Sequence, residues 1–240
     1  MTPLLKSQPE FTAVYGHNLF GLPDNNPFGL KVDTFLRLHK ISYIYHNIID
    51  IKNAPRGQLP YIDDGGNIIT DSNHIIDYLC EKHHLQPDKH LSDQQKNLQF
   101  LITRTLDNHL YWVMSYSRWQ DERFWPEFKE AFLKQCPDVS EATLIKAHEY
   151  NIEKYHFQGI GRYEADAIYQ SGIADLQAVD NELGQQTFLF GDKIHTVDVV
   201  CYGFLANIFY FKIDTPLRAF LKQQKRLRNY VSRIRERLDY

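Results

Sequence analysis

Apolar residues change their spacing along the chain, and this change divides the sequence into two parts. Between residues 11 and 84, short strand-like runs alternate with helix-like stripes. Runs rich in β-branched and aromatic residues predict strands at 11–15, 41–49, 59–62 and 67–70. An apolar stripe over residues 27–39 predicts one helix, and Asp71 or Ser72 is expected to cap a second.

Beyond a polar, proline-containing linker at 86–90, strand signals are few. Helices are predicted over 92–119, from Pro126, from Ser140, after Thr196 and over 217–238. The order β-α-β, then β-β-α, then helices favours a thioredoxin-like α/β domain at residues 1–86 and an all-α domain at residues 93–240. This fold class limits the architecture, but only the motifs can indicate a function.

Composition narrows the class of protein. The 240 residues are 43% hydrophobic and 24% charged with a formal net charge of −3, which is typical of a globular protein and argues against a nucleic-acid partner. Three widely spaced cysteines fit reduced thiols in the cytoplasm. No signal peptide is predicted, and the most apolar run, 197–211, is shorter than a membrane span needs. The 11 histidines lack zinc-site spacing, so no metal is expected.

A candidate binding site starts at Gln58-Leu59-Pro60 and continues at Asp71-Ser72. Backbone groups of Leu59 next to a strand-initiating proline are available to pair with an extended ligand. The free amides and the dipole at a helix N-terminus favour an anionic group beside Asp71 and Ser72. This combination suits a peptide with an amino-acid-like end. The alternative is purely structural: the proline begins a strand and Asp71-Ser72 caps a helix.

These motifs resemble the glutathione-binding half of the glutathione S-transferase superfamily, and residues 188–198 resemble the segment before its central buried helix. A narrower similarity points to the Fax (failed axon connections)/metaxin-like branch. It is carried by residues 26–31, 36–38, 55–62, 118–119 and 159–162. The resemblance implies the glutathione S-transferase fold, with glutathione as co-substrate held by Gln58, Leu59, Pro60, Asp71 and Ser72, and it implies a homodimer.

Two residues are candidates for activating the glutathione thiol, because a thiolate is the nucleophile in such chemistry. Tyr15 ends the first predicted strand, where tyrosine-type relatives carry their catalytic hydroxyl. Asn26 precedes Pro27 at a predicted helix start, where related proteins often carry Ser or Cys, and its amide can donate a hydrogen bond. The alternatives are a core tyrosine at Tyr15 and a plain N-cap at Asn26.

Aromatic residues gather in the first long predicted helix, at the place where the resemblance implies a pocket for the electrophile. The candidates are Trp112, Tyr116, Arg118 and Trp119. An aromatic, partly cationic pocket suits an apolar or anionic substrate. The alternative is that these rings pack the core or a dimer interface and that Arg118 forms a buried ion pair.

Two functions therefore stay open. The first is a transferase that uses the glutathione thiolate on an electrophile or a peroxide. The second is a non-catalytic binding module, which the departures at Asn26 and Gly29 from the Ser/Cys-Pro-Phe-Cys pattern favour. A smaller departure, His195 at the cap of the buried helix, is expected to weaken a capping box by about 1 kcal/mol.

Overall fold

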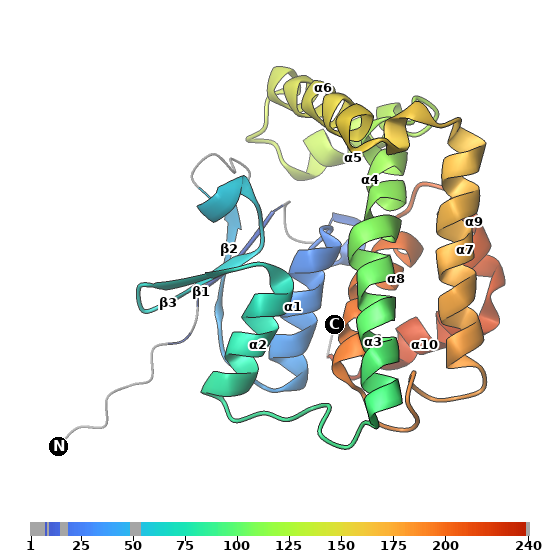
Figure 1. The fold of residues 1–240 in the computed structure, drawn as a ribbon. Coiled ribbons are helices and arrows are strands. Elements are labelled where there is room, and N and C mark those ends of the chain that lie inside the picture. The colour runs from blue at the N-terminus through green and yellow to red at the C-terminus, as the bar shows by residue number, and fades with distance from the viewer. Residues whose placement is uncertain (1–7, 9, 15–18, 49–53, 239–240) are drawn as a thin grey trace.

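The computed structural model describes residues 8, 10–14, 19–48 and 54–238 (Figure 1). Four strands form one sheet in the order β2-β1-β3-β4. Their bounds are Glu10–Val14 for β1, Ile44–Ile48 for β2, Tyr61–Asp64 for β3 and Asn67–Thr70 for β4. β1 runs parallel to β2, whereas β3 runs antiparallel to β1 and β4.

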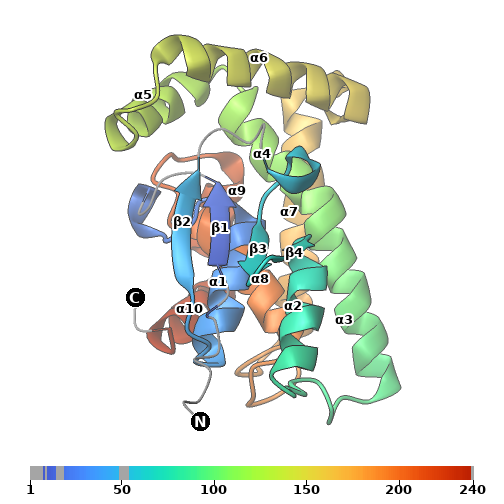
Figure 2. The same ribbon diagram turned by 90° about the vertical axis from the view of Figure 1, so that its left-hand side faces the viewer.

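Two helices pack against this sheet, α1 (Pro27–Leu38) and α2 (Ser72–Lys82), and Figure 2 shows them beside the strands. Their apolar stripes meet the sheet in one buried cluster that includes Val32, Phe35, Ile62, Ile75 and Leu79. The other side of α1 packs on α8 (Thr196–Phe209), the most deeply buried helix. Because α1 is shared between the two layers, its N-terminus lies where the sheet side meets the helical side.

The helical part surrounds α8. Its other helices are α3 (Asp93–Thr105), α4 (Tyr111–Trp119), α5 (Trp125–Gln135), α6 (Glu141–Gln158), α7 (Ala165–Leu183), α9 (Pro216–Gln223) and α10 (Lys225–Glu236). Short 3₁₀ turns lie at Leu19–Gly21 (η1), Pro55–Gly57 (η3) and Ile160–Arg162 (η5). No helix in the described ranges is long and apolar enough to cross a membrane. The predicted domain limits at residues 86 and 93 stay predictions.

Two predicted helices are interrupted. The helix expected over 92–119 contains a π-helical turn at Leu106–Leu110 (η4), which separates α3 from α4. The helix expected over 217–238 is divided at Gln224, whose ψ of 93° is not helical. Neither break coincides with a proline or glycine, so the usual sequence signals of a helix end were absent.

The cap of α8 corrects the expectation for His195. The backbone N–H of His195 donates to Asp198 Oδ2 at 2.8 Å, so this half of the capping box is present. The next two backbone amides of the helix donate to side chains from other segments. Thr196 N–H donates to Asp88 at 3.0 Å, and Val197 N–H donates to Gln99 at 3.3 Å. These side chains from the linker and α3 offset the predicted weakening of the box.

Candidate functional site

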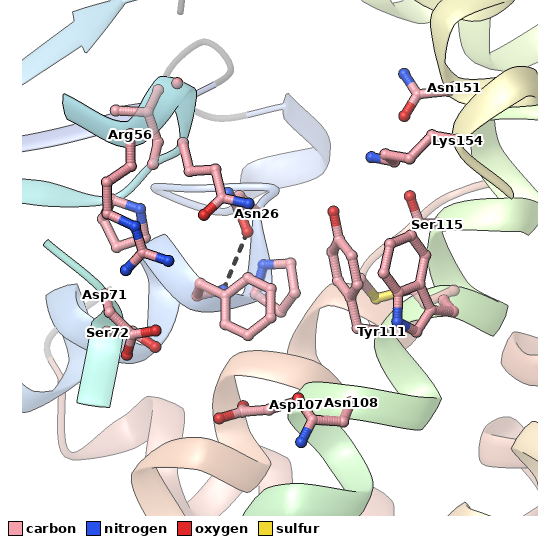
Figure 3. Close-up of a pocket in the computed structure, with 18 of the residues that line it drawn as sticks. Asn26, Arg56, Asp71, Ser72, Asp107, Asn108, Tyr111, Ser115, Asn151 and Lys154 are labelled. Carbon is pink, nitrogen blue, oxygen red and sulfur yellow. Dashed lines mark hydrogen bonds between the residues drawn. The ribbon is translucent and has the colours of Figure 1, made fainter. Parts of the chain in front are cut away.

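A cavity of about 380 Å³ lies between the sheet side and the helical side of the fold. Figure 3 shows Asn26, Asp71 and Ser72 on one side of it and Tyr111, Ser115, Asn151 and Lys154 on the other. The predicted site residues that line it are Asn26, Gln58, Leu59, Pro60, Asp71, Ser72, Trp112, Arg118 and Trp119. The fold thus brings segments from four distant parts of the sequence to one concave surface.

The segment before β3 forms one edge of the cavity. The Leu59–Pro60 peptide bond is cis, a point that the sequence left open. Leu59 and Pro60 are buried, whereas Gln58 is exposed. The preceding turn η3 brings Arg56 to the same edge with a positive φ of 62°. Arg56 was not among the predicted site residues.

Asp71 and Ser72 open α2 at the cavity. The Asp71 carboxylate accepts a hydrogen bond from Asn73 N–H at 2.9 Å, so it caps the helix as the structural alternative supposed. Asp71 also has a φ of 72°, a backbone conformation that is uncommon for residues with a side chain and is concentrated at ligand sites. Ser72 is 3% exposed and lines the cavity. Capping and ligand binding are therefore compatible at this helix start.

Asn26 is the N-cap of α1. Its Oδ1 accepts a hydrogen bond from Phe28 N–H at 3.1 Å, which is the dashed line in Figure 3. In the described part of the chain, no group accepts a hydrogen bond from its Nδ2. The oxygen of the amide thus caps the helix while the nitrogen stays available to a ligand. The other candidate, Tyr15, lies outside the described residues.

Asp24 holds the backbone of Asn26 and fills the space next to Gly29. The Asp24 side chain is fully buried, and its Oδ1 accepts a hydrogen bond from Asn26 N–H at 2.8 Å. Burial raises the pKa of this carboxyl well above its ordinary value. A Cβ atom on Gly29 would lie only 1.8 Å from Asp24 Oδ2. The missing Cys at position 29 therefore has a packing cause, because Asp24 fills the space.

Replacing Gly29 with alanine is expected to lower the free energy of unfolding by about 1–3 kcal/mol, because Asp24 cannot move away without breaking its bond to Asn26. Urea titration of the single variant and of the pair Asp24→Ala/Gly29→Ala tests this. Asp24→Ala removes the clashing carboxylate, so the double variant should recover part of the stability that Gly29→Ala alone loses. A Gly29→Ala midpoint equal to that of the wild type would contradict the packing explanation.

Two of the three aromatic residues predicted for the electrophile pocket form an aromatic wall of the cavity. Trp112 and Trp119 line the cavity. Tyr116 does not, because its ring packs against Tyr155 and Tyr169 with centroids 6.5 and 6.0 Å away. Tyr116 is therefore a core residue, and its helical spacing from Trp112 was a packing signal.

Arg118 borders the cavity but serves mainly to join elements. Its guanidinium donates to the backbone oxygens of Asn25 at 2.5 Å and Asn207 at 2.8 Å, and it lies 4.6 Å from the Phe211 ring centroid. It thereby links α4 to α8 and to the loop that carries Asn26. Besides donating these bonds to carbonyl oxygens, Arg118 affects the buried Asp24 carboxyl: burial raises the pKa of that carboxyl, and the charge of Arg118 opposes the shift.

Sequence reasoning missed a buried polar group at the base of the cavity. Lys31 Nζ donates to Asn73 Oδ1 at 2.6 Å and lies 3.5 Å from Asp107 Oδ2, and Asn73 Nδ2 donates to the same carboxylate oxygen at 3.0 Å. Burial lowers the pKa of Lys31, and the charge of Asp107 opposes that shift. The sequence signal that could have revealed this buried cluster was the presence of Lys31 and Asp107 among apolar residues in the predicted helices.

The α6 wall was also missed. Lys154 and Asn151 face the cavity from α6, across from Asn26 (Figure 3). The positions of these two residues along α6 do not predict that they face the cavity, because this depends on how α6 packs against α4. Among the described residues, no group of three or more His, Cys, Asp or Glu side chains could hold a metal ion.

Comparison with known proteins gives the family. Residues 27–124 match the model of the glutathione S-transferase N-terminal domain, and residues 172–234 match a C-terminal domain model of that family. An isoprene-epoxide–glutathione S-transferase from Rhodococcus is 30% identical over 95% of this chain and 99% of its own length. Failed axon connections from Drosophila melanogaster is 30% identical over 90% of this chain and 55% of its own length.

A solved structure supports the fold class. The β-etherase LigF from Sphingobium superposes with a TM-score of 0.65 at 15% identity, covering 97% of this chain and 99% of that one. The predicted thioredoxin-like domain followed by an all-α domain is thus confirmed. The chain belongs to the glutathione S-transferase superfamily, in the branch that includes Failed axon connections.

Proposed function

We propose that this protein binds glutathione in the cavity and uses its thiolate to attack a small electrophile. One observation carries the proposal: the Asn26 amide, the Leu59–Pro60 segment and the start of α2 line the same cavity as an aromatic wall. A family that uses glutathione and a relative named for an isoprene epoxide support it. An epoxide is therefore our first choice of electrophile.

Each part of glutathione has a suitable partner in this proposal. The backbone of Leu59 pairs with the cysteinyl unit, and the amides at the start of α2 with Ser72 bind the γ-glutamyl carboxylate. The glutathione ammonium lies near Asp71 and Asp107. Asp107 supports this arrangement because the residue lines the cavity and its buried Oδ1 has no hydrogen-bond partner among the described residues.

Asn26 is the proposed thiolate donor. Its Nδ2 donates a hydrogen bond to the sulfur, and the N-terminus of α1 adds a favourable dipole. Tyr15 stays the second candidate. The electrophile lies against Trp112 and Trp119. In the proposed mechanism the thiolate attacks the electrophile directly, so no protein side chain forms a covalent intermediate.

A glutathione-binding module without turnover is the competing proposal. It is favoured by the chemistry of Asn26, because an amide cannot take the thiol proton and here is already held as a helix cap. Initial rates with glutathione and styrene oxide distinguish the two. Saturation in both substrates is expected for the transferase. Binding of glutathione with no turnover of epoxides, halides or peroxides would favour the module.

The assembly and location of the protein remain predictions. We propose a homodimer in the cytoplasm, with neither nucleic acid nor a membrane as partner. Exposed apolar side chains at Phe100 and Leu101 on α3 supply surface that a second copy could cover. Light scattering that gives the mass of a single chain would contradict the dimer.

A further inference from the structure

Lys154 is the basic residue of the α6 wall. Its Nζ lies 5.6 Å from the Trp112 ring centroid, 6.0 Å from that of Tyr150 and 5.5 Å from that of Tyr155. Among the described residues, no carboxylate or hydrogen-bond acceptor is paired with this ammonium. Aromatic faces stabilise a cation without taking its protons, so Lys154 keeps its N–H groups for a ligand.

The neighbouring polar groups are already engaged with one another. Ser115 Oγ lies 2.6 Å from Tyr155 Oη, and Tyr155 Oη donates to Asn151 Oδ1 at 3.4 Å. Asn151 Nδ2 donates to the backbone oxygen of Ala147 at 2.8 Å. This network fixes the wall around Lys154 and leaves its ammonium as the group best placed to meet a polar atom of the substrate.

We propose that Lys154 is a catalytic proton donor to the oxygen of the epoxide electrophile. This inference rests on the proposed function. The glutathione sulfur forms a bond to one epoxide carbon, and the C–O bond at that carbon breaks with its electron pair going to oxygen. The resulting alkoxide takes a proton from the Lys154 ammonium. The product is a hydroxy thioether. The neutral amine regains a proton from solvent, which balances the proton that the glutathione thiol released to solvent when it formed the thiolate.

The surroundings of Lys154 fit this role. Burial lowers its pKa to about 8, so the group is still protonated at neutral pH but gives up its proton more readily than an exposed lysine. The other titratable and charged groups on its own helix are Glu141, Lys146, His148, Glu149, Tyr150, Glu153, Tyr155 and His156. Those on the elements packed against α6 are Tyr111, Tyr116 and Arg118 on α4 and Arg162 on η5, and Arg104 and Asp107 line the same cavity. The epoxide rate should therefore fall above about pH 8 as Lys154 loses its proton.

The test compares styrene oxide with benzyl chloride, because a chloride leaving group needs no proton. Lys154→Met is expected to lower kcat/KM for styrene oxide about 10²-fold while changing the benzyl chloride value by less than about 3-fold. Lys154→Arg keeps the positive charge but holds its proton, so it should restore little of the epoxide rate. Both variants should lose the fall in rate above about pH 8. Lys146→Met, on the exposed side of α6, is the matched control.

Five results would overturn the inference. One is an equal loss on both substrates, which would indicate a structural role, and another is full rescue by Lys154→Arg, which would indicate charge alone. A third is selective loss of the epoxide rate in Tyr111→Phe while Lys154→Met stays active. Finally, if the wild type converts neither substrate, the proposed function falls together with the inference. If it converts both and Lys154→Met is unaffected, only the inference falls.

Discussion

Replacing Asp107 with alanine is expected to lower the free energy of unfolding by about 3–5 kcal/mol, because it leaves the Lys31 ammonium without its carboxylate. The two side chains are 0% and 4% exposed, and their charged atoms lie 3.5 Å apart. Asn73 alone cannot neutralise the charge. Lys31, Asn73 and Asp107 come from α1, α2 and η4, so the variant weakens the junction below the cavity.

Two further variants make this prediction specific. Adding Lys31→Met to Asp107→Ala removes the uncompensated charge and should recover part of the lost stability. Glu141→Ala breaks the exposed pair with Lys129 and should leave the urea midpoint nearly unchanged. Unfolding of Asp107→Ala at the same urea concentration as Glu141→Ala would show that the Lys31–Asp107 pair does not stabilise the fold.

Asn26→Ala is expected to reduce kcat/KM about 10²-fold, since a hydrogen bond to the thiolate is lost at the reacting atom. The same change removes the N-cap of α1, which accounts for about 1 kcal/mol of stability. Activity must therefore be separated from folding. Initial rates, the apparent pKa of bound glutathione and urea midpoints are measured on each variant, and loss of the donor should raise that pKa.

Two conservative replacements separate the cap from the donor. Asn26→Asp keeps an oxygen to cap the helix but loses Nδ2, so it should fold normally and be inactive. Asn26→Ser keeps the cap and offers a hydroxyl donor, so it should retain much of the activity. Full activity in Asn26→Asp would show that Nδ2 has no role at the sulfur and would shift attention to Tyr15.

Local sequence patterns predicted much of the fold because they report local preferences. Pro27 after Asn26 marked the start of α1, and Ser140 marked the start of α6, since caps depend on a few adjacent residues. The glycine at 159 ends α6 with a φ of 109°, a left-handed conformation that glycine adopts readily. The residues at 58–60 and 71–72 could likewise be singled out from the sequence as cavity-lining candidates, because each of the two motifs is contiguous.

The parts that sequence could not supply depend on packing between distant segments. The π-helical turn at Leu106–Leu110 has no local signature, yet Asp107 lies in it. Lys154 meets the cavity because α6 crosses α4, which no periodicity reveals. Tyr116 was misplaced for the opposite reason, because helical spacing cannot tell a ring that faces the cavity from one that faces α7.

Calorimetric titration with reduced glutathione measures whether the cavity binds this peptide at the start of α2. We expect a dissociation constant in the micromolar-to-millimolar range for the wild type and for Ser42→Ala, which changes an exposed serine outside the cavity. Ser72→Ala, which removes a hydroxyl at the start of α2, should bind at least about 10-fold more weakly, the effect of losing a hydrogen bond to a charged group. Wild-type protein that gives no binding heat at millimolar glutathione, or Ser72→Ala that binds as tightly as wild type, would contradict the proposed site.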